Sequence, residues 1–256
     1  SMWRRLFSTA THSPAAPSLP NKNPKRFWKG VGVHTFGDGT FAVKLDQRLL
    51  KTPAMRPLLL PTISLARAVA YEWGAQKTHV DPYVMPLTSL VMRSYDLVAL
   101  DRATHVETLL SYLMTDTLCN LAPSPSPLRK MQDEVWVPVI KWFEKKYDVT
   151  LKVTEGIDVS SHSMTTRRRM KVVLEDMDSL TLTGLVSAAS NCKSMICAMA
   201  LYEEYFGAEA CTDASLLENL YQQKEWGMAE GAHDVDRSDI LSDLAASHLL
   251  FTLLKK

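Results

Sequence analysis

A single change of hydrophobic period, at Pro61-Thr62, constrains this chain more than any other feature. Residues 41–45 before it place apolar side chains on one face with period two, the pattern of a half-buried β-strand. Residues 63–73 after it repeat apolar side chains at helical spacing, and Thr62 is a residue type that caps helix N-termini. The sequence therefore predicts a short strand-rich region followed by a long, mostly helical one.

The strand-rich region is expected to be a small antiparallel meander. Aromatic and β-branched residues dominate 27–33, Gly37-Asp38-Gly39 marks a turn, and the period-two stretch of 40–46 follows. Two more short apolar runs, at 49–52 and 57–60, are bounded by prolines. Such a meander is too thin to be stable alone, so it needs a helical partner that covers its apolar face.

Apolar stripes at helical spacing continue from Thr62 towards the C-terminus and predict a succession of helices. The expected helices span about 62–73, 87–97, 101–113, 130–147, a basic stretch from about 165, 180–205, 212–226 and a last stretch from about 236. Residues 149–153 are expected to form one isolated strand. We therefore expect an α+β fold, with a small antiparallel β-rich N-terminal domain over 25–84 packed on a larger all-helical C-terminal domain over 85–256.

Residues 1–24 are expected to be a cloning scar followed by a transit peptide and a linker. Ser1 precedes Met2, and no acidic residue occurs before Gly37 among several arginines, lysines and hydroxyl residues. Such leaders are typical of mitochondrial transit peptides, and the apolar core of about 7–15 residues of a secretory signal is missing. Prolines then space the leader from the folded part as an extended linker. The alternative is a tail with no addressing role.

Composition argues against several classes of function. With 29 basic and 28 acidic residues the formal charge is +1, so no global field attracts nucleic acid. No apolar run reaches the roughly 18 residues of a membrane span, so we expect no membrane insertion. The 10 glycines never form a phosphate-binding pattern. The four cysteines, at 119, 192, 197 and 211, make no C-x-x-C pair and are expected to be small apolar residues in a reducing compartment.

Six short motifs carry a family resemblance in the right order along the chain. They are Lys25–Lys29, Val43–Pro53, Leu60–Thr62, Glu72–Gln76, Met85–Thr88 and Trp226–Asp236. Together they resemble the mitochondrial ATP synthase F₁ complex assembly factor 2 family, the Atp12-type chaperones. The sequence departs from the family at Trp28, where Tyr is more usual, and in the loops around Pro123 and Ser160.

The resemblance implies a β-rich N-terminal domain, a larger helical domain and a chaperone of the mitochondrial matrix. It implies that the chain binds the newly imported F₁ alpha subunit until that subunit pairs with beta, without nucleotide, metal, other cofactor or catalysis. An unassembled subunit exposes an apolar interface, and covering such a patch suppresses aggregation without chemistry. We expect the chaperone to be a monomer.

A competing interpretation is a metal-dependent phosphohydrolase built on His233 and Asp234. Such pairs hold divalent metals only when further ligands join them, and the other histidines form no second recognisable ligand pair. Asp234 and Asp236 are therefore expected to cap the last helix, with no metal bound.

A third interpretation is an RNA-binding module in which the basic residues of 167–171 contact phosphate. Glu175 and Asp176 follow close behind, so we expect a solvated helix face instead and no nucleic acid partner. No interleaved aromatic residues support stacking on single-stranded bases.

Four residues are the candidates for the site and its scaffold. Glu230 lies in a glycine-flanked connection between helices, where binding residues are often displayed, and no apolar stripe explains it. Glu230 and Asp234 are therefore expected to bind the client. Trp73 continues the apolar stripe of the first helix, so Glu72 and Trp73 are expected to be structural.

Overall fold

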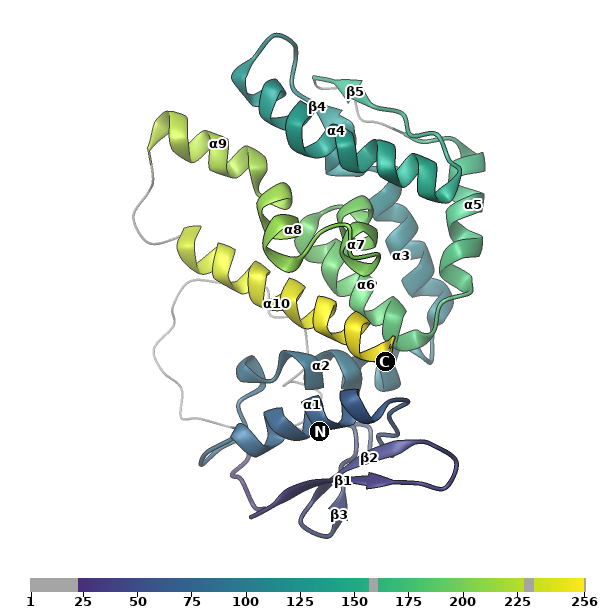
Figure 1. Ribbon diagram of the computed structural model, residues 1–256, viewed down its shortest axis with the longest axis vertical. Helices are drawn as coiled ribbons and strands as arrows, with labels where there is room; N and C mark the ends of the chain where they lie inside the picture. The colour runs from purple at the N-terminus through teal and green to yellow at the C-terminus, as the bar shows by residue number, and fades with distance from the viewer. Residues whose placement is uncertain (1–22, 157–160, 228–232, 256) are drawn as a thin grey trace. The chain divides into compact units, whose positions relative to one another are not determined.

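The computed structural model describes residues 23–156, 161–227 and 233–255 of the chain (Figure 1). These residues form two compact units, one reaching up to Leu100 and including Thr252 onward, the other running from Asp101 to Phe251. The units divide between Leu100 and Asp101, and the domain bounds expected at 25–84 and 85–256 stay a prediction. The leader lies almost wholly outside the described residues, so its role stays a prediction.

The first unit contains a three-stranded antiparallel sheet in the order β1-β2-β3. Its strands are β1 (Val31–Thr35), β2 (Phe41–Leu45) and β3 (Arg48–Leu49). Val33 pairs with Val43 in the register of β1 and β2, and an isolated bridge joins Phe41 to Leu60. The expected meander is confirmed, although its last apolar run pairs through isolated bridges and forms no strand.

Helix α1 (Ile63–Ala75) packs on β1 and β2 of this sheet (Figure 1). Thr62 caps the helix as expected, since its hydroxyl accepts the N–H of Leu65 at 3.2 Å. The buried residues of α1 are Leu65, Ala66, Val69 and Trp73. The predicted stripe is wrong at Ile63, which is 37% exposed at the solvent edge of the first turn, while Leu65 is buried instead.

A second helix of the first unit lacks a cap of its own. The short 3₁₀ turn η2 (Pro82–Val84) leads into α2 (Pro86–Arg93), which continues as the π-helical turn η3 (Ser94–Val98). Together α2 and η3 cover the helix expected at 87–97. Met85 precedes α2 and makes no capping hydrogen bond, so the first free N–H groups of the helix need acceptors from elsewhere.

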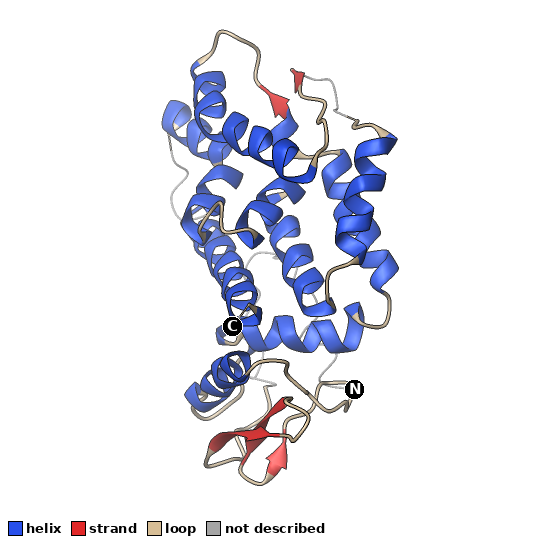
Figure 2. Cartoon of the chain, turned by 45° about the vertical axis from the view of Figure 1, so that its right-hand side comes forward, coloured by secondary structure: helices blue, strands red, loops and turns tan. Residues whose placement is uncertain are grey.

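The second unit is built almost entirely of helices (Figure 2). They are α3 (Arg102–Met114), η4 (Thr117–Cys119), α4 (Pro127–Tyr147), α5 (Met164–Glu175), α6 (Ser179–Cys192), α7 (Met195–Tyr202), α8 (Ala208–Ser215), α9 (Leu217–Trp226) and α10 (His233–Leu254), whose last residues belong to the first unit. A parallel two-residue ladder joins β4 (Asn120–Leu121) to β5 (Thr154–Glu155). The isolated strand expected at 149–153 is therefore wrong. The strand lies at 154–155 and pairs with β4, which lies far earlier in the sequence, so the local pattern does not reveal this pairing.

Two stretches expected to be single helices are each divided. Lys193 adopts a left-handed conformation (φ 53°) and ends α6, and Ser194 then caps α7 by accepting the N–H of Cys197 at 3.0 Å. The stretch expected at 212–226 is two helices, α8 and α9, which meet at Leu216. Periodicity gives no sign of the first break, because α7 is apolar on every side.

Helix α7 forms the centre of the core of the second unit. Every residue from Met195 to Leu201 is fully buried, among α3, α4, α6 and α8. Gly184 allows α6 to approach α10 closely, since a Cβ at this position would lie 2.5 Å from the Phe251 ring. Within the described residues, no helix is both long and apolar enough to cross a membrane.

Candidate functional site

The segment expected to bind a client, 226–236, connects α9 to α10 in the second unit. Glu230 lies outside the described residues, and the side chains of His233, Asp234 and Asp236 are likewise not described. Helix α10 already begins at His233, so Asp234 lies within its first turn and does not precede the helix as an N-cap does. The described residues on either side show how α9 and α10, the helices that flank this segment, are held.

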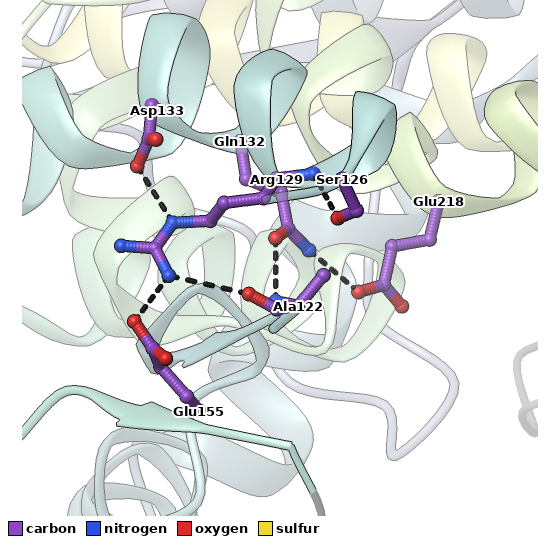
Figure 3. Close-up of polar contacts among 7 residues, drawn as sticks. All are labelled: Ala122, Ser126, Arg129, Gln132, Asp133, Glu155 and Glu218. Carbon is purple, nitrogen blue, oxygen red and sulfur yellow. Dashed lines mark hydrogen bonds and ion pairs between the residues drawn. The ribbon is translucent and has the colours of Figure 1, made fainter. Parts of the chain in front are cut away.

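The amide of Gln132 in α4 fixes the start of α9 (Figure 3). Its Oε1 accepts the N–H of Ala122 at 2.7 Å, and its Nε2 donates to Glu218 in the first turn of α9 at 2.9 Å. Gln132 is fully buried, so both ends of its amide use their hydrogen-bonding capacity inside the protein. Burial raises the pKa of Glu218, and the Gln132 donor opposes that rise. This contact ties α9 to α4.

Arg129, one turn before Gln132, ties the β4–β5 ladder to the same helix (Figure 3). Its guanidinium donates to Asp133 at 2.8 Å, to Glu155 of β5 and to the carbonyl of Ala122 at 3.2 Å. The Arg129 side chain is 18% exposed, whereas its two carboxylate partners are about half exposed. The backbone of Ala122 is therefore fixed at its N–H by Gln132 and at its carbonyl by Arg129.

The far end of the segment is held by an exposed ion pair. Arg237 in α10 contacts Asp213 in α8 at 2.7 Å, with 40% and 53% of the side chains exposed. Exposed pairs of this kind contribute about 0–1 kcal/mol. This ion pair therefore adds little to the stability of the start of α10.

In the first unit, Glu72 supplies the cap that α2 lacks. Its two carboxylate oxygens accept the N–H groups of Leu87 at 2.9 Å and Thr88 at 2.7 Å. Burial is the largest influence on the pKa of Glu72 and raises it, against these hydrogen bonds. The neighbouring Trp73 is 2% exposed, as its stripe predicted, and its ring lies 5.1 Å from that of Trp28. Both side chains therefore point into the first unit.

Asp116 is a buried carboxyl with a shifted pKa that the sequence did not reveal. It is fully buried in the second unit, where one oxygen accepts the N–H of Leu118 at 3.1 Å and the other that of Ile196 at 3.0 Å. Burial raises its pKa to about 7, against those two hydrogen bonds. Asp116 precedes Ile196 by 80 residues, so no local motif announces the contact.

Comparison with known proteins covers nearly the whole chain. The sequence profile of the ATP12 chaperone protein family matches residues 25–144. The mitochondrial protein atp12 of Schizosaccharomyces pombe is 30% identical over 96% of this chain and 87% of its own length. This chain belongs to the ATP12 chaperone family. The mitochondrial protein ATP12 of Saccharomyces cerevisiae is 25% identical over 90% of this chain and 84% of its own length.

The solved structures agree with this assignment. The crystal structure of Atp12 from Paracoccus denitrificans is 30% identical to the chain and matches it with a TM-score of 0.84, over 90% of this chain and 98% of that one. The α+β architecture expected from the sequence is therefore confirmed as an Atp12-like fold. Membership of a chaperone family also means that the chain is not an enzyme, which removes the phosphohydrolase alternative.

Three of the motifs that carry the ATP12 resemblance meet inside the first unit. Arg26 of the first motif lies over the Trp28 ring at 5.5 Å and donates to the backbone carbonyl of Gln76 in the fourth motif. Glu72 of that fourth motif holds the motif that begins at Met85, through the N–H of Thr88. These contacts join three motifs within one unit, and the structural role expected of Glu72 and Trp73 stays a prediction.

Most of the basic side chains of residues 167–171 contact other residues of this chain. Arg167 and Lys171 both contact Glu107 of α3, and Lys171 also lies 3.8 Å from Glu175. The hydrogen bond from Lys171 lowers the pKa of Glu107. Arg169 donates to the carbonyl of Tyr147 at 3.2 Å. These contacts favour the ion-paired helix face over a phosphate-binding patch.

Proposed function

We propose that this ATP12-family chaperone promotes assembly of the mitochondrial ATP synthase by binding the unassembled alpha subunit of F₁-ATPase in the matrix. It holds the subunit until beta pairs with it. The observation that carries the proposal is similarity to a protein named as mitochondrial atp12 along 96% of this chain. Residues 2–24, after the cloning scar at Ser1, act as the mitochondrial transit peptide and its linker. The chaperone works as a monomer.

Client capture uses the segment 226–236, with Glu230 and Asp234 as its contact residues. The segment belongs to the family motifs and follows α9, whose first turn, at the other end of the helix, is anchored through Glu218 to the buried Gln132. A rigid support reduces the conformational entropy that is lost when a contact forms. A charge-assisted hydrogen bond from the client to Glu230 is worth roughly 1.5–3 kcal/mol, or about a 10- to 150-fold change in affinity.

Co-expression with the alpha subunit tests this proposal. We expect the parent chain to co-purify with the alpha subunit and keep it soluble. Glu230→Lys should abolish protection, since it places a charge of the wrong sign against the client, and Glu230→Gln and Asp234→Asn should weaken it. Glu134→Lys makes the same charge change on an exposed part of α4 and should protect normally. All four variants should melt like the parent.

Two outcomes contradict the proposal in different ways. If the parent chain fails to capture the alpha subunit, the client is wrong. If Glu230→Lys protects fully, or loses its melting transition together with its activity, Glu230 is not a client contact.

A further inference from the structure

Three of the four cysteines meet inside the second unit. Cys192 ends α6, Cys197 lies in the first turn of α7, and Cys211 lies in α8. Their Sγ atoms all lie within 4.8 Å of one another, and those of Cys192 and Cys211 are 3.6 Å apart. None of the three is more than 2% exposed. The cluster is therefore a dry group of three sulfur atoms.

Helix ends place these sulfur atoms. The left-handed Lys193 and the capping Ser194 turn the chain between α6 and α7, which brings Cys192 and Cys197 together although they belong to different helices. The Cys211 thiol lies 3.6 Å from the carbonyl oxygen of Cys197, to which it donates. Because α7 is the fully buried centre of the unit, the three positions are set by packing on every side.

The spacing suits a single metal ion. Metal–sulfur bonds of about 2.3 Å, arranged in a plane around one ion, separate the sulfur atoms by about 4.0 Å. The observed separations, from 3.6 Å up to at most 4.8 Å, bracket that value. An ion therefore fits among these sulfur atoms with side-chain shifts of a fraction of an ångström.

We propose that Cys192, Cys197 and Cys211 form a buried three-sulfur site for Cu(I). Thiolate sulfur is a soft ligand that selects Cu(I) and Zn²⁺ among biological metals. Structural zinc almost always takes four ligands, and in the described part of the chain no His, Asp or Glu joins the three sulfur atoms at this spacing. The number of donors therefore favours Cu(I).

Charge is the main cost of the site, because its surroundings are buried. Three thiolates around Cu(I) leave a net charge of −2, and binding releases the three thiol protons to solvent. The N-terminal turn of α7, which contains Cys197, carries the positive end of the helix dipole beside this charge. Because the cysteines are sealed from solvent, the ion enters during folding.

Loading of the full-length chain with Cu(I) tests the site. The reduced protein is refolded without oxygen in the presence of Cu(I), then dialysed against a Cu(I) chelator, and bound copper is counted per chain. We expect one copper per chain, an X-ray absorption spectrum with three sulfur neighbours, and a higher melting temperature than the copper-free protein.

Alanine variants assign the ligands. Cys197→Ala and Cys211→Ala should each weaken copper binding by at least about 100-fold. Cys119→Ala is the matched control, because Cys119 is also fully buried but lies outside the cluster, and it should bind as tightly as the parent. If an alanine variant does not fold, the absorption spectrum of the parent still decides the number of sulfur neighbours.

Three results overturn the proposal. The first is a parent chain that retains no copper after refolding, which leaves the cysteines as packing residues. The second is equal copper binding by Cys197→Ala and Cys119→Ala. The third is retention of zinc with a fourth ligand in place of copper.

Discussion

In both units, a carboxyl group from elsewhere in the sequence accepts N–H groups at the start of a helix. The two units differ in how far away in the sequence that carboxyl lies. In the first unit, Glu72 caps α2 by accepting N–H groups 15 and 16 residues further on. In the second, Asp116 accepts the N–H of Ile196 at the start of α7, 80 residues further on. A buried N–H without an acceptor is costly, so each unit uses a carboxyl from elsewhere. The acceptor for α2 is therefore supplied from nearby in the sequence, and that for α7 from far away.

The largest effect is expected from Trp73→Arg in the first unit. The substitution places a charge where a 2% exposed indole packs on Trp28, and removing such a ring costs about 3–5 kcal/mol before the charge is counted. We expect loss of soluble, cooperatively folded protein. Solubility and the melting transition measure this outcome.

The matched control for Trp73 is Tyr71→Arg in the same helix. Tyr71 is 79% exposed, so this arginine should leave the melting transition within about 0.5 kcal/mol of the parent. A Trp73→Arg protein that melts like Tyr71→Arg would show that burial of the indole does not hold the first unit together.

The next largest effect separates the two capping carboxyls. Asp116→Ala leaves two N–H groups without an acceptor in a dry core, at about 1–3 kcal/mol each. Glu72→Ala removes a partly buried carboxyl and should cost less, about 1–3 kcal/mol in total. Urea unfolding of the two variants measures both losses. Equal losses would remove the distinction that we draw between the units.

The same distinction explains which features the sequence could predict. The meander, the Thr62 cap and the burial of Trp73 follow from residues close to one another, so periodicity and capping rules were sufficient. The contacts of Asp116 with Ile196, of Gln132 with Glu218 and of Cys211 with Cys197 join residues 80, 86 and 14 positions apart. The break at Lys193 was missed for a different reason, since an apolar stripe cannot mark the end of a helix that is buried on all sides.

A smaller effect is expected from a pair of glycines, one in each unit. Gly184→Ala in α6 presses a methyl group against the Phe251 ring, whereas Gly74→Ala in α1 meets no atom within 4 Å. Both variants gain up to about 1 kcal/mol of helix propensity, so their difference isolates the overpacking term of about 1–3 kcal/mol. We expect Gly74→Ala to melt at or above the parent and Gly184→Ala below Gly74→Ala. Identical melting would mean that α6 and α10 are not tightly packed at this point.

The smallest effect is a pH dependence in the first unit. Burial raises the pKa of Glu72 in the folded state, so the folded chain holds this proton more tightly than the unfolded chain does. The contribution of Glu72 to stability is therefore fully present below the unfolded pKa of about 4.5 and declines as pH rises through the folded value. Glu72→Gln has no such proton. The free energy of unfolding of the parent, minus that of Glu72→Gln, should then be larger at pH 4 than at pH 7. Urea unfolding at the two pH values measures this difference, and a difference that grows with pH would mean that the N–H groups of α2 outweigh burial at this carboxyl.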